Sequence, residues 1–339
     1  MGAQGKKKYY HAIDLVRVVA AFIVVAVHTD PLMTYFETGN YFINTVIGRL
    51  VVPYFFIVSG FFFARKIDFR VPMQTDIHFL KGFLKKIVLI YLIWSAIFLP
   101  FQWLDWLQRG DDMEYWVTYV HEFFFKGSYY PLWYLTGLMV ATALAYLLFK
   151  WLKPWMVIVI TGILFVIGAS MNAYYHVFRF DGLFEGYYDI FLTTRNGVFF
   201  GSFYVSIGMV LSKRDIPLSA TWNRNLFIVS LILMTIEVFS LRSFDFSRGL
   251  DMWFFAVPTT YFLFRWLQQV DLKHRGYFAY FRPLSLLMYV SHGLLIIQFK
   301  YVQDVNSLLY FFVVLTGTIL LSMSIILLSK TFPVFRRLY

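Results

Sequence analysis

The sequence predicts an all-α protein that crosses a membrane about ten times, with both ends in the cytoplasm. Of its 339 residues, 60% are hydrophobic and only 14% are charged, and the mean hydropathy is +0.64. Soluble domains carry about 25% charged residues. Apolar segments of roughly 17–25 residues, the length that a bilayer core requires, recur along the whole chain.

We expect one membrane domain over 12–329, between a basic N-terminus at 1–11 and a basic tail at 330–339. Its seventh span is the weakest because it carries Glu237. The stretch Tyr115–Phe125 is apolar but too short to cross, so we expect a helix in the outer interface. The predicted spans are 12–34, 42–64, 83–103, 129–150, 154–171, 195–212, 225–241, 249–267, 284–303 and 308–329.

The orientation follows from the distribution of Lys and Arg, which concentrate in cytoplasmic loops of membrane proteins. Basic residues occupy alternate loops and both ends of the chain, whereas most acidic residues fall in the remaining loops. This asymmetry predicts that both termini are cytoplasmic. The net charge is +11, but the cations lie at helix ends, so the expected partner is membrane lipid and not nucleic acid.

The composition also excludes several kinds of chemistry. The chain has no cysteine, so disulfides, thiolate nucleophiles and cysteine-bound zinc or iron–sulfur clusters are ruled out. No phosphate-binding loop, dinucleotide loop or zinc-binding helix pattern is present. We therefore expect no metal site.

Arg17 and His28 are the most informative pair of residues. A helix turns about 100° per residue, so eleven steps return to within roughly 20° of the start. The two side chains thus leave one face of the first span, roughly 16 Å apart along its axis. Ionisable groups inside a membrane helix are costly and mark functional candidates. We expect both groups to line one water-accessible passage.

Each of these polar groups has two interpretations. Asp14 and Arg17 form either an interfacial ion pair or, through the guanidinium, an anion site that suits phosphates. His28 is either a structural imidazole or a general base that works near neutral pH.

The ninth span carries a second polar stripe. Ser285, Tyr289 and His292 share one helix face at spacings of four and seven residues. Such a stripe faces either a cavity or a partner helix. The sequence leaves both open.

Three charged residues stand near the outer ends of their spans. Glu237, as a lone carboxylate in the membrane, is expected to be protonated or paired. Arg49 and Arg195 are candidates to pair with Glu237 or Asp189, or to bind a substrate anion. Snorkelling to the interface is the alternative for either arginine.

Two aromatic-rich segments complete the candidates. Pro53 and Ser59 lie inside one span, where they indicate either a local break near a cavity or close helix packing. Trp133 and Tyr134 are expected at the outer interface, where such rings are common.

Taken together, these segments resemble the acyltransferase-3 family of membrane proteins. The match is spread in order over almost the whole chain, and the ten-span core of the family agrees with the hydropathy. The matching pieces are Arg17 with His28, Val52-Pro53-Tyr54-Phe55-Phe56 with Ser59-Gly60, Pro131-Leu132-Trp133-Tyr134-Leu135, and Ser285 with Tyr289 and His292.

The resemblance implies transfer of an acyl group, usually acetyl, from cytoplasmic acetyl-CoA to a hydroxyl. The acceptor would be an envelope glycan or a small molecule beyond a bacterial cytoplasmic membrane. Arg17 and Ser59 would hold the acyl-CoA, and His28 would take the acceptor proton or carry the acyl group. Tyr289 or Ser59 would stabilise the oxyanion, and we place Asp14 and His292 in the same centre. The expected acceptor-binding residues are Arg49, Trp133, Tyr134, Arg195 and Glu237.

Other segments are similar to the membrane half of VanT-type serine racemases. They are His28-Thr29-x-Pro31-Leu32, Glu37-Thr38-Gly39 and Thr194-Arg195-Asn196-Gly197-Val198-Phe199-Phe200. That resemblance implies import of L-serine, with a cytoplasmic racemase domain or partner at the C-terminus. A purely structural membrane partner is a third hypothesis, which the intramembrane charges disfavour.

Overall fold

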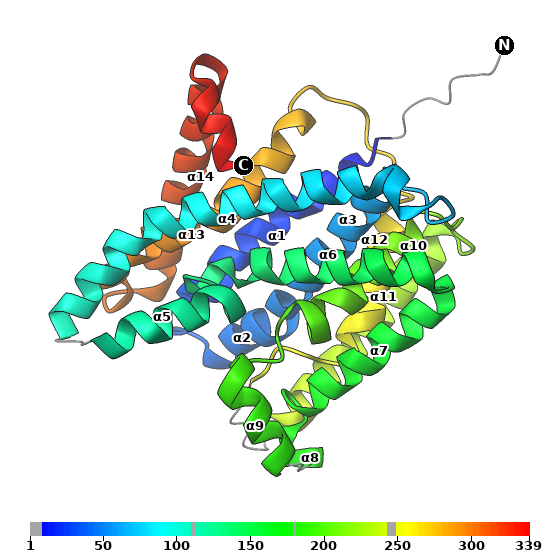
Figure 1. Ribbon diagram of the computed structural model, residues 1–339. Helices are drawn as coiled ribbons and strands as arrows, with labels where there is room; N and C mark the ends of the chain where they lie inside the picture. Colours follow the sequence, from blue (N-terminus) through cyan, green and yellow to red (C-terminus); the bar gives the residue numbers. More distant parts are fainter. Residues whose placement is uncertain (1–8, 110–112, 179–180, 243–248) are drawn as a thin grey trace.

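The computed structural model describes residues 9–109, 113–178, 181–242 and 249–339, and every regular element in these ranges is helical (Figure 1). The predicted all-α fold is therefore confirmed. Most of the expected basic N-terminus lies outside the described residues. The elements are α1 (His11–Thr29), α2 (Glu37–Phe42), η1 (Ile43–Ile47), α3 (Gly48–Ala64), α4 (Met73–Arg109), α5 (Met113–Phe125), η2 (Tyr130–Leu132), α6 (Trp133–Trp151), α7 (Pro154–Ser170), α8 (Tyr175–Phe178), α9 (Asp181–Phe191), η3 (Gly197–Gly201), α10 (Ser202–Leu211), α11 (Ala220–Leu241), α12 (Ala256–Leu267), α13 (Phe278–Gln303), α14 (Ser307–Thr331) and η4 (Pro333–Leu338).

Within the described ranges, seven helical runs are long and apolar enough to cross a bilayer, as a membrane protein requires. Two further apolar helices are shorter, at Pro154–Ser170 and Gly197–Leu211. The expected helix over 249–267 is wrong in its first third, because only α12 is helical there. Its 12 residues rise about 18 Å, less than the roughly 30 Å of a bilayer core.

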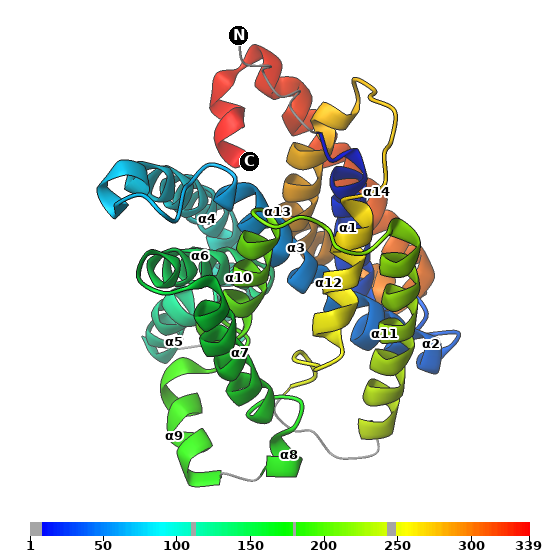
Figure 2. The same cartoon turned by 90° about the vertical axis from the view of Figure 1, so that its right-hand side faces the viewer.

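The helices enclose α1 and α3 at the centre (Figures 1 and 2). α1 packs against α13 and α3, α13 packs against α14, and α3 packs along α10. α11 (Ala220–Leu241) packs against α12, and α12 in turn packs against α3. The polar face of α1 is thereby turned toward protein and away from lipid.

The segment before α12 is irregular, and it lies beside the residues that follow α7. Asn172 holds it, because its side-chain oxygen accepts hydrogen bonds from the backbone N–H groups of Asp251 (3.0 Å) and Met252 (3.3 Å). Non-helical backbone at membrane depth is tolerated where protein covers it or where it lines a cavity.

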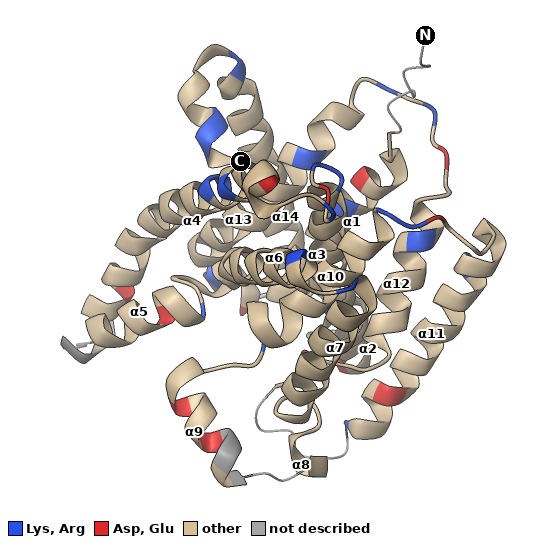
Figure 3. Cartoon of the chain, turned by 45° about the vertical axis from the view of Figure 1, so that its right-hand side comes forward, with Lys and Arg blue, Asp and Glu red and all other residues tan. Residues whose placement is uncertain are grey.

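Charge is distributed unevenly along the molecule (Figure 3). Lys and Arg gather at the end that holds the start of α1 and the end of η4, whereas α5 and α9 carry acidic residues at the other end. The expected charge asymmetry is therefore present in three dimensions. The number of crossings and the orientation in the bilayer stay predictions.

Candidate functional site

Three cavities adjoin one another along α1. The His28 cavity includes His28, Arg49, Tyr130, Arg195, Asp251 and Tyr289 in its lining. The Arg17 cavity includes Arg17, Ser59, Lys86, Tyr134, Ser285 and Tyr289. The basic mouth includes Arg17, Arg65, Lys66, Lys86 and Arg282. The expected single passage is thus divided: Arg17 and His28 line different cavities, and Tyr289 belongs to both.

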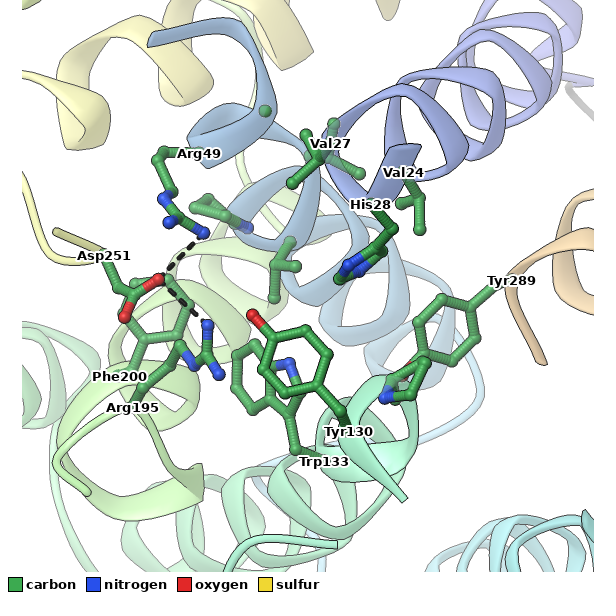
Figure 4. Close-up of a pocket in the computed structure, with 15 residues that line it drawn as sticks. Val24, Val27, His28, Arg49, Tyr130, Trp133, Arg195, Phe200, Asp251 and Tyr289 are labelled. Atoms are coloured by element: carbon green, nitrogen blue, oxygen red, sulfur yellow. Dashed lines mark hydrogen bonds and ion pairs between the residues drawn. The ribbon is translucent and has the colours of Figure 1, made fainter. Parts of the chain in front are cut away.

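His28 lies in the last turn of α1, where its ring points into the His28 cavity (Figure 4). The ring stacks on His292, with ring centroids 5.1 Å apart, and meets Tyr130 edge-on at 5.1 Å. No described residue forms a hydrogen bond with its ring nitrogens. The ring is half-buried, so it is held in place while part of it stays open to the cavity.

His292 supports His28 from α13 and is fully buried. Its Nδ1 lies 2.7 Å from the carbonyl oxygen of Tyr289 and 3.2 Å from that of Met288. A carbonyl only accepts, so Nδ1 carries the proton, and in the neutral ring Nε2 keeps a lone pair. Nε2 is buried and has no hydrogen-bond partner within the described part of the chain.

Two tyrosines separate the His28 cavity from the Arg17 cavity. The hydroxyl of Tyr289 donates to the carbonyl of Pro131, and its ring meets Tyr134 edge-on at 5.4 Å. The hydroxyl of Tyr134 lies 3.1 Å from the Ser59 hydroxyl. The Tyr289 proton is therefore already engaged. The Ser59–Tyr134 pair is the better-placed donor toward the Arg17 cavity.

Arg17 shares a carboxylate with a second arginine. Asp14 Oδ1 accepts from Arg282 Nε at 2.8 Å and lies 3.7 Å from an Arg17 terminal nitrogen. Two cations therefore surround one buried anion, and the Nε of Arg17 has no partner among the residues described. Asp14 is not brought together with His28, because it lies about 21 Å away along α1. It orients the cations.

Arg49 and Arg195 both bind Asp251 Oδ1, each at 2.9 Å (Figure 4). The expectation that they pair with Glu237 or Asp189 is wrong. Arg195 also lies over Trp133, 4.6 Å from the ring centroid. Burial alone would raise the pKa of Asp251, but the guanidinium groups of Arg195 and Arg49 outweigh it and hold that pKa below its ordinary value.

Sequence reasoning did not single out Asp251. Its only signal was an acidic residue at the start of an apolar segment, and that signal does not identify a partner.

Glu237 has a different role from the one expected. Its carboxylate accepts from the Tyr174 hydroxyl and from the backbone N–H groups of Phe254 (2.8 Å) and Phe255 (3.0 Å). These N–H groups precede α12, so the carboxylate holds the start of that helix. Among the described residues Glu237 is hydrogen-bonded and has no cationic partner, and it does not line the His28 cavity.

This chain is similar to known proteins over most of its length. Residues 10–327 match the family model for an acyltransferase domain. An amino-acid racemase of Enterococcus faecalis is 28% identical over 80% of this chain and 37% of its own length. A serine/alanine racemase of Enterococcus gallinarum is 27% identical over 91% of this chain and 44% of its own. The chain thus spans less than half the length of these relatives, and no solved structure matches it.

Proposed function

Because the chain belongs to the acyltransferase-3 family of membrane proteins, we propose that it transfers an acetyl group from acetyl-CoA to a hydroxyl acceptor across a bacterial cytoplasmic membrane. The observation that carries the proposal is the meeting of two unlike cavities at Tyr289. The Arg17 cavity contains Arg17 and Lys86 and continues into the basic mouth, whereas the His28 cavity contains an imidazole.

The Arg17 cavity and the basic mouth suit an acyl-CoA. Five cations line them, and the buried Nε of Arg17 is an unused donor among the described residues. Phosphates favour clustered guanidinium and ammonium groups. Arg17, Lys86 and Arg282 would hold the phosphates, with Ser59 nearer the thioester. The predicted orientation opens this mouth to the cytoplasm, where acyl-CoA is found.

The His28 cavity supplies the base. A nitrogen of His28 takes the proton of the acceptor hydroxyl while that oxygen bonds to the thioester carbonyl carbon. The carbon–sulfur bond then breaks, and the leaving sulfur receives the proton from His28. The Ser59 or Tyr134 hydroxyl donates to the oxyanion that forms between these steps. Stacking on His292 keeps the His28 ring at the junction.

Import of L-serine is the second candidate, and the names of the relatives favour it. The Arg49–Asp251–Arg195 cluster offers cations for a carboxylate and an anion for an ammonium group. In that case the chain would serve a racemase domain or partner at its cytoplasmic C-terminus. The basic mouth has no evident use in such a carrier.

A binding measurement tests whether the Arg17 cavity and the basic mouth hold acetyl-CoA. In purified full-length protein, Arg17→Ala should weaken acetyl-CoA binding about tenfold or more, because a charge-assisted contact contributes about 1.5–3 kcal/mol. Isothermal titration calorimetry gives the affinity. Lys85→Ala is the matched control, because Lys85 is an exposed cation next to Lys86 but outside these cavities. Equal binding by wild type and Arg17→Ala would contradict this assignment.

The rate of acetyl transfer or hydrolysis tests whether His28 is the general base. His28→Gln should lower transfer or hydrolysis by on the order of 10²–10⁴-fold, because it removes the base while keeping a polar group of similar size. His274→Gln is the control. That histidine is exposed, and it lies 3.0 Å from His11, at the opposite end of α1 from His28. Both variants should melt close to wild type. Serine counterflow in vesicles without any acetyl-CoA binding would favour the carrier instead.

A further inference from the structure

A second opening lies beside the His28 cavity, between α6 and the segment that joins α9 to η3. We call it the lateral groove, and its walls include Phe124, Phe125, Val140, Phe191, Arg195 and Val198. Its lining also includes the polar side chains of Thr136 and Asn196. The groove is therefore mostly apolar, and it has one cation, Arg195, among the described residues that line it.

The groove has a fixed outer wall. His121 Nε2 lies 2.7 Å from the Ile190 carbonyl oxygen, so it donates to that carbonyl and ties α5 to α9. The rings of Phe125 and Phe191 meet edge-on at 5.5 Å in the same place. Exposed apolar side chains mark its rim: Phe124 is 68% exposed and Val140 is 46% exposed. Val140 belongs to a predicted span and Phe124 to the expected interfacial helix, and exposed apolar side chains at such positions suit contact with lipid.

The inner end of the groove reaches the site. Trp133 and Arg195 line both the lateral groove and the His28 cavity, so their stacked side chains form the wall between the two. An occupant of the groove therefore lies next to the residues that surround His28.

This inner end carries uncompensated positive charge. Arg49 and Arg195 share the single carboxylate of Asp251. The Nε atoms of both arginines are buried and have no hydrogen-bond partner in the described ranges. Buried donors and charges without partners are costly, so an anion at this position would be stabilised.

We propose that the acceptor is an anionic lipid whose headgroup carries the hydroxyl that is acylated. One hydrocarbon chain lies in the lateral groove, the acidic group lies at Arg195, and the headgroup hydroxyl reaches His28. This inference rests on the proposed function and names its acceptor class. The hydroxyl loses its proton to His28 and gains the acyl group, while the thiol leaves with that proton. A soluble neutral sugar would leave the positive charge uncompensated and would have no hydrocarbon chain to fill the groove.

Photolabelling tests lipid occupancy without any acyl transfer. Wild-type protein in vesicles would be irradiated with a phosphatidylglycerol probe that bears a diazirine in its acyl chain, and labelled peptides mapped by mass spectrometry. We expect labels within 133–140 and 191–198, and at least fivefold less label from a phosphatidylcholine probe. Glycerol 3-phosphate should not displace the label, because it lacks the chain. Equal labelling by both probes, or displacement by glycerol 3-phosphate, would overturn the inference.

Filling the groove tests its use in the reaction. Val140→Trp should reduce both labelling and acetyl transfer to phosphatidylglycerol at least fivefold. Val159→Trp is the matched control, since that α7 valine is 49% exposed outside the groove. Val198→Trp provides a second test if Val140→Trp does not fold. Unchanged labelling in a folded variant would contradict a lipid site in the lateral groove. Normal labelling with acetyl-CoA hydrolysis but no acetyl transfer to phosphatidylglycerol would overturn the acceptor class alone. Normal labelling with neither hydrolysis nor transfer would contradict the proposed function itself.

Discussion

Asp251 accepts ion pairs from Arg49 and Arg195, and its side chain is only 14% exposed. Removing a buried charge that others depend on leaves those groups unpaired, which costs more than the pair itself contributes. The importance of Asp251 thus lies in the two cations that it holds at the rim of the His28 cavity.

Asp251→Asn should lower the free energy of unfolding by about 3 kcal/mol, because two half-buried guanidinium groups lose their anion. Thermal melting of the detergent-solubilised protein measures this. The double variant Asp251→Asn with Arg195→Met should lose less than the sum of the single variants. Full additivity would contradict a direct interaction.

The same pair predicts a pH dependence. The pKa of Asp251 is lower in the folded protein than in the unfolded chain, so its stabilising contribution is present above an unfolded pKa of about 3.9. That contribution is lost as the pH falls through the folded pKa. The melting temperatures of wild type and Asp251→Asn should therefore begin to converge only below about pH 4 and should meet below the folded pKa, and a constant gap would contradict the assignment.

Among the elements, α3 and α10 make the tightest approach at two glycines. A Cβ atom added at Gly60 would lie 2.3 Å from the Val205 carbonyl oxygen, and one at Gly208 would lie 2.1 Å from that of Ile57. Small residues allow membrane helices to come this close. α3 carries Ser59, so this contact sets the position of the Ser59–Tyr134 pair.

Gly60→Ala or Gly208→Ala should cost about 1–3 kcal/mol, because the added methyl group meets backbone that cannot move aside alone. Gly82→Ala in α4 is the control for the melting temperature, since no atom lies within 4 Å of a Cβ there. Melting temperature and acetyl-CoA hydrolysis should fall together in the first two variants. A Gly60→Ala protein that melts like Gly82→Ala would disprove the close approach.

Several predicted spans correspond closely to observed helices. The runs over 154–171 and 308–329 appear as α7 and α14, because a long apolar run has few alternatives in a membrane. Tyr115–Phe125 is helical within α5, as expected. The segment 249–267 is not helical over its whole length, although its hydropathy predicts a span. Asn172 and Glu237 instead bind the backbone N–H groups before α12.

At the scale of the whole molecule, charge asymmetry predicts cytoplasmic termini, and the absence of cysteine makes this easy to test. Lys153→Cys lies in the turn between α6 and α7, and Val305→Cys lies in the turn between α13 and α14. In intact spheroplasts, a membrane-impermeant maleimide should label Val305→Cys and spare Lys153→Cys until the cells are opened. The reverse pattern would invert the topology and remove acetyl-CoA from the basic mouth.

The family membership indicated by the motifs is confirmed over residues 10–327. Local hydropathy is enough to predict the all-helical membrane fold, and a fixed turn per residue is enough to place Arg17 and His28 along the first helix. Tertiary packing is needed to explain that Asp251 pairs with Arg49 and Arg195, that His292 stacks on His28, and that Tyr289 lies between two cavities. The physical reason is that helix periodicity fixes the face of a residue on its own helix. The partner that meets it depends on the packing of helices far apart in the chain.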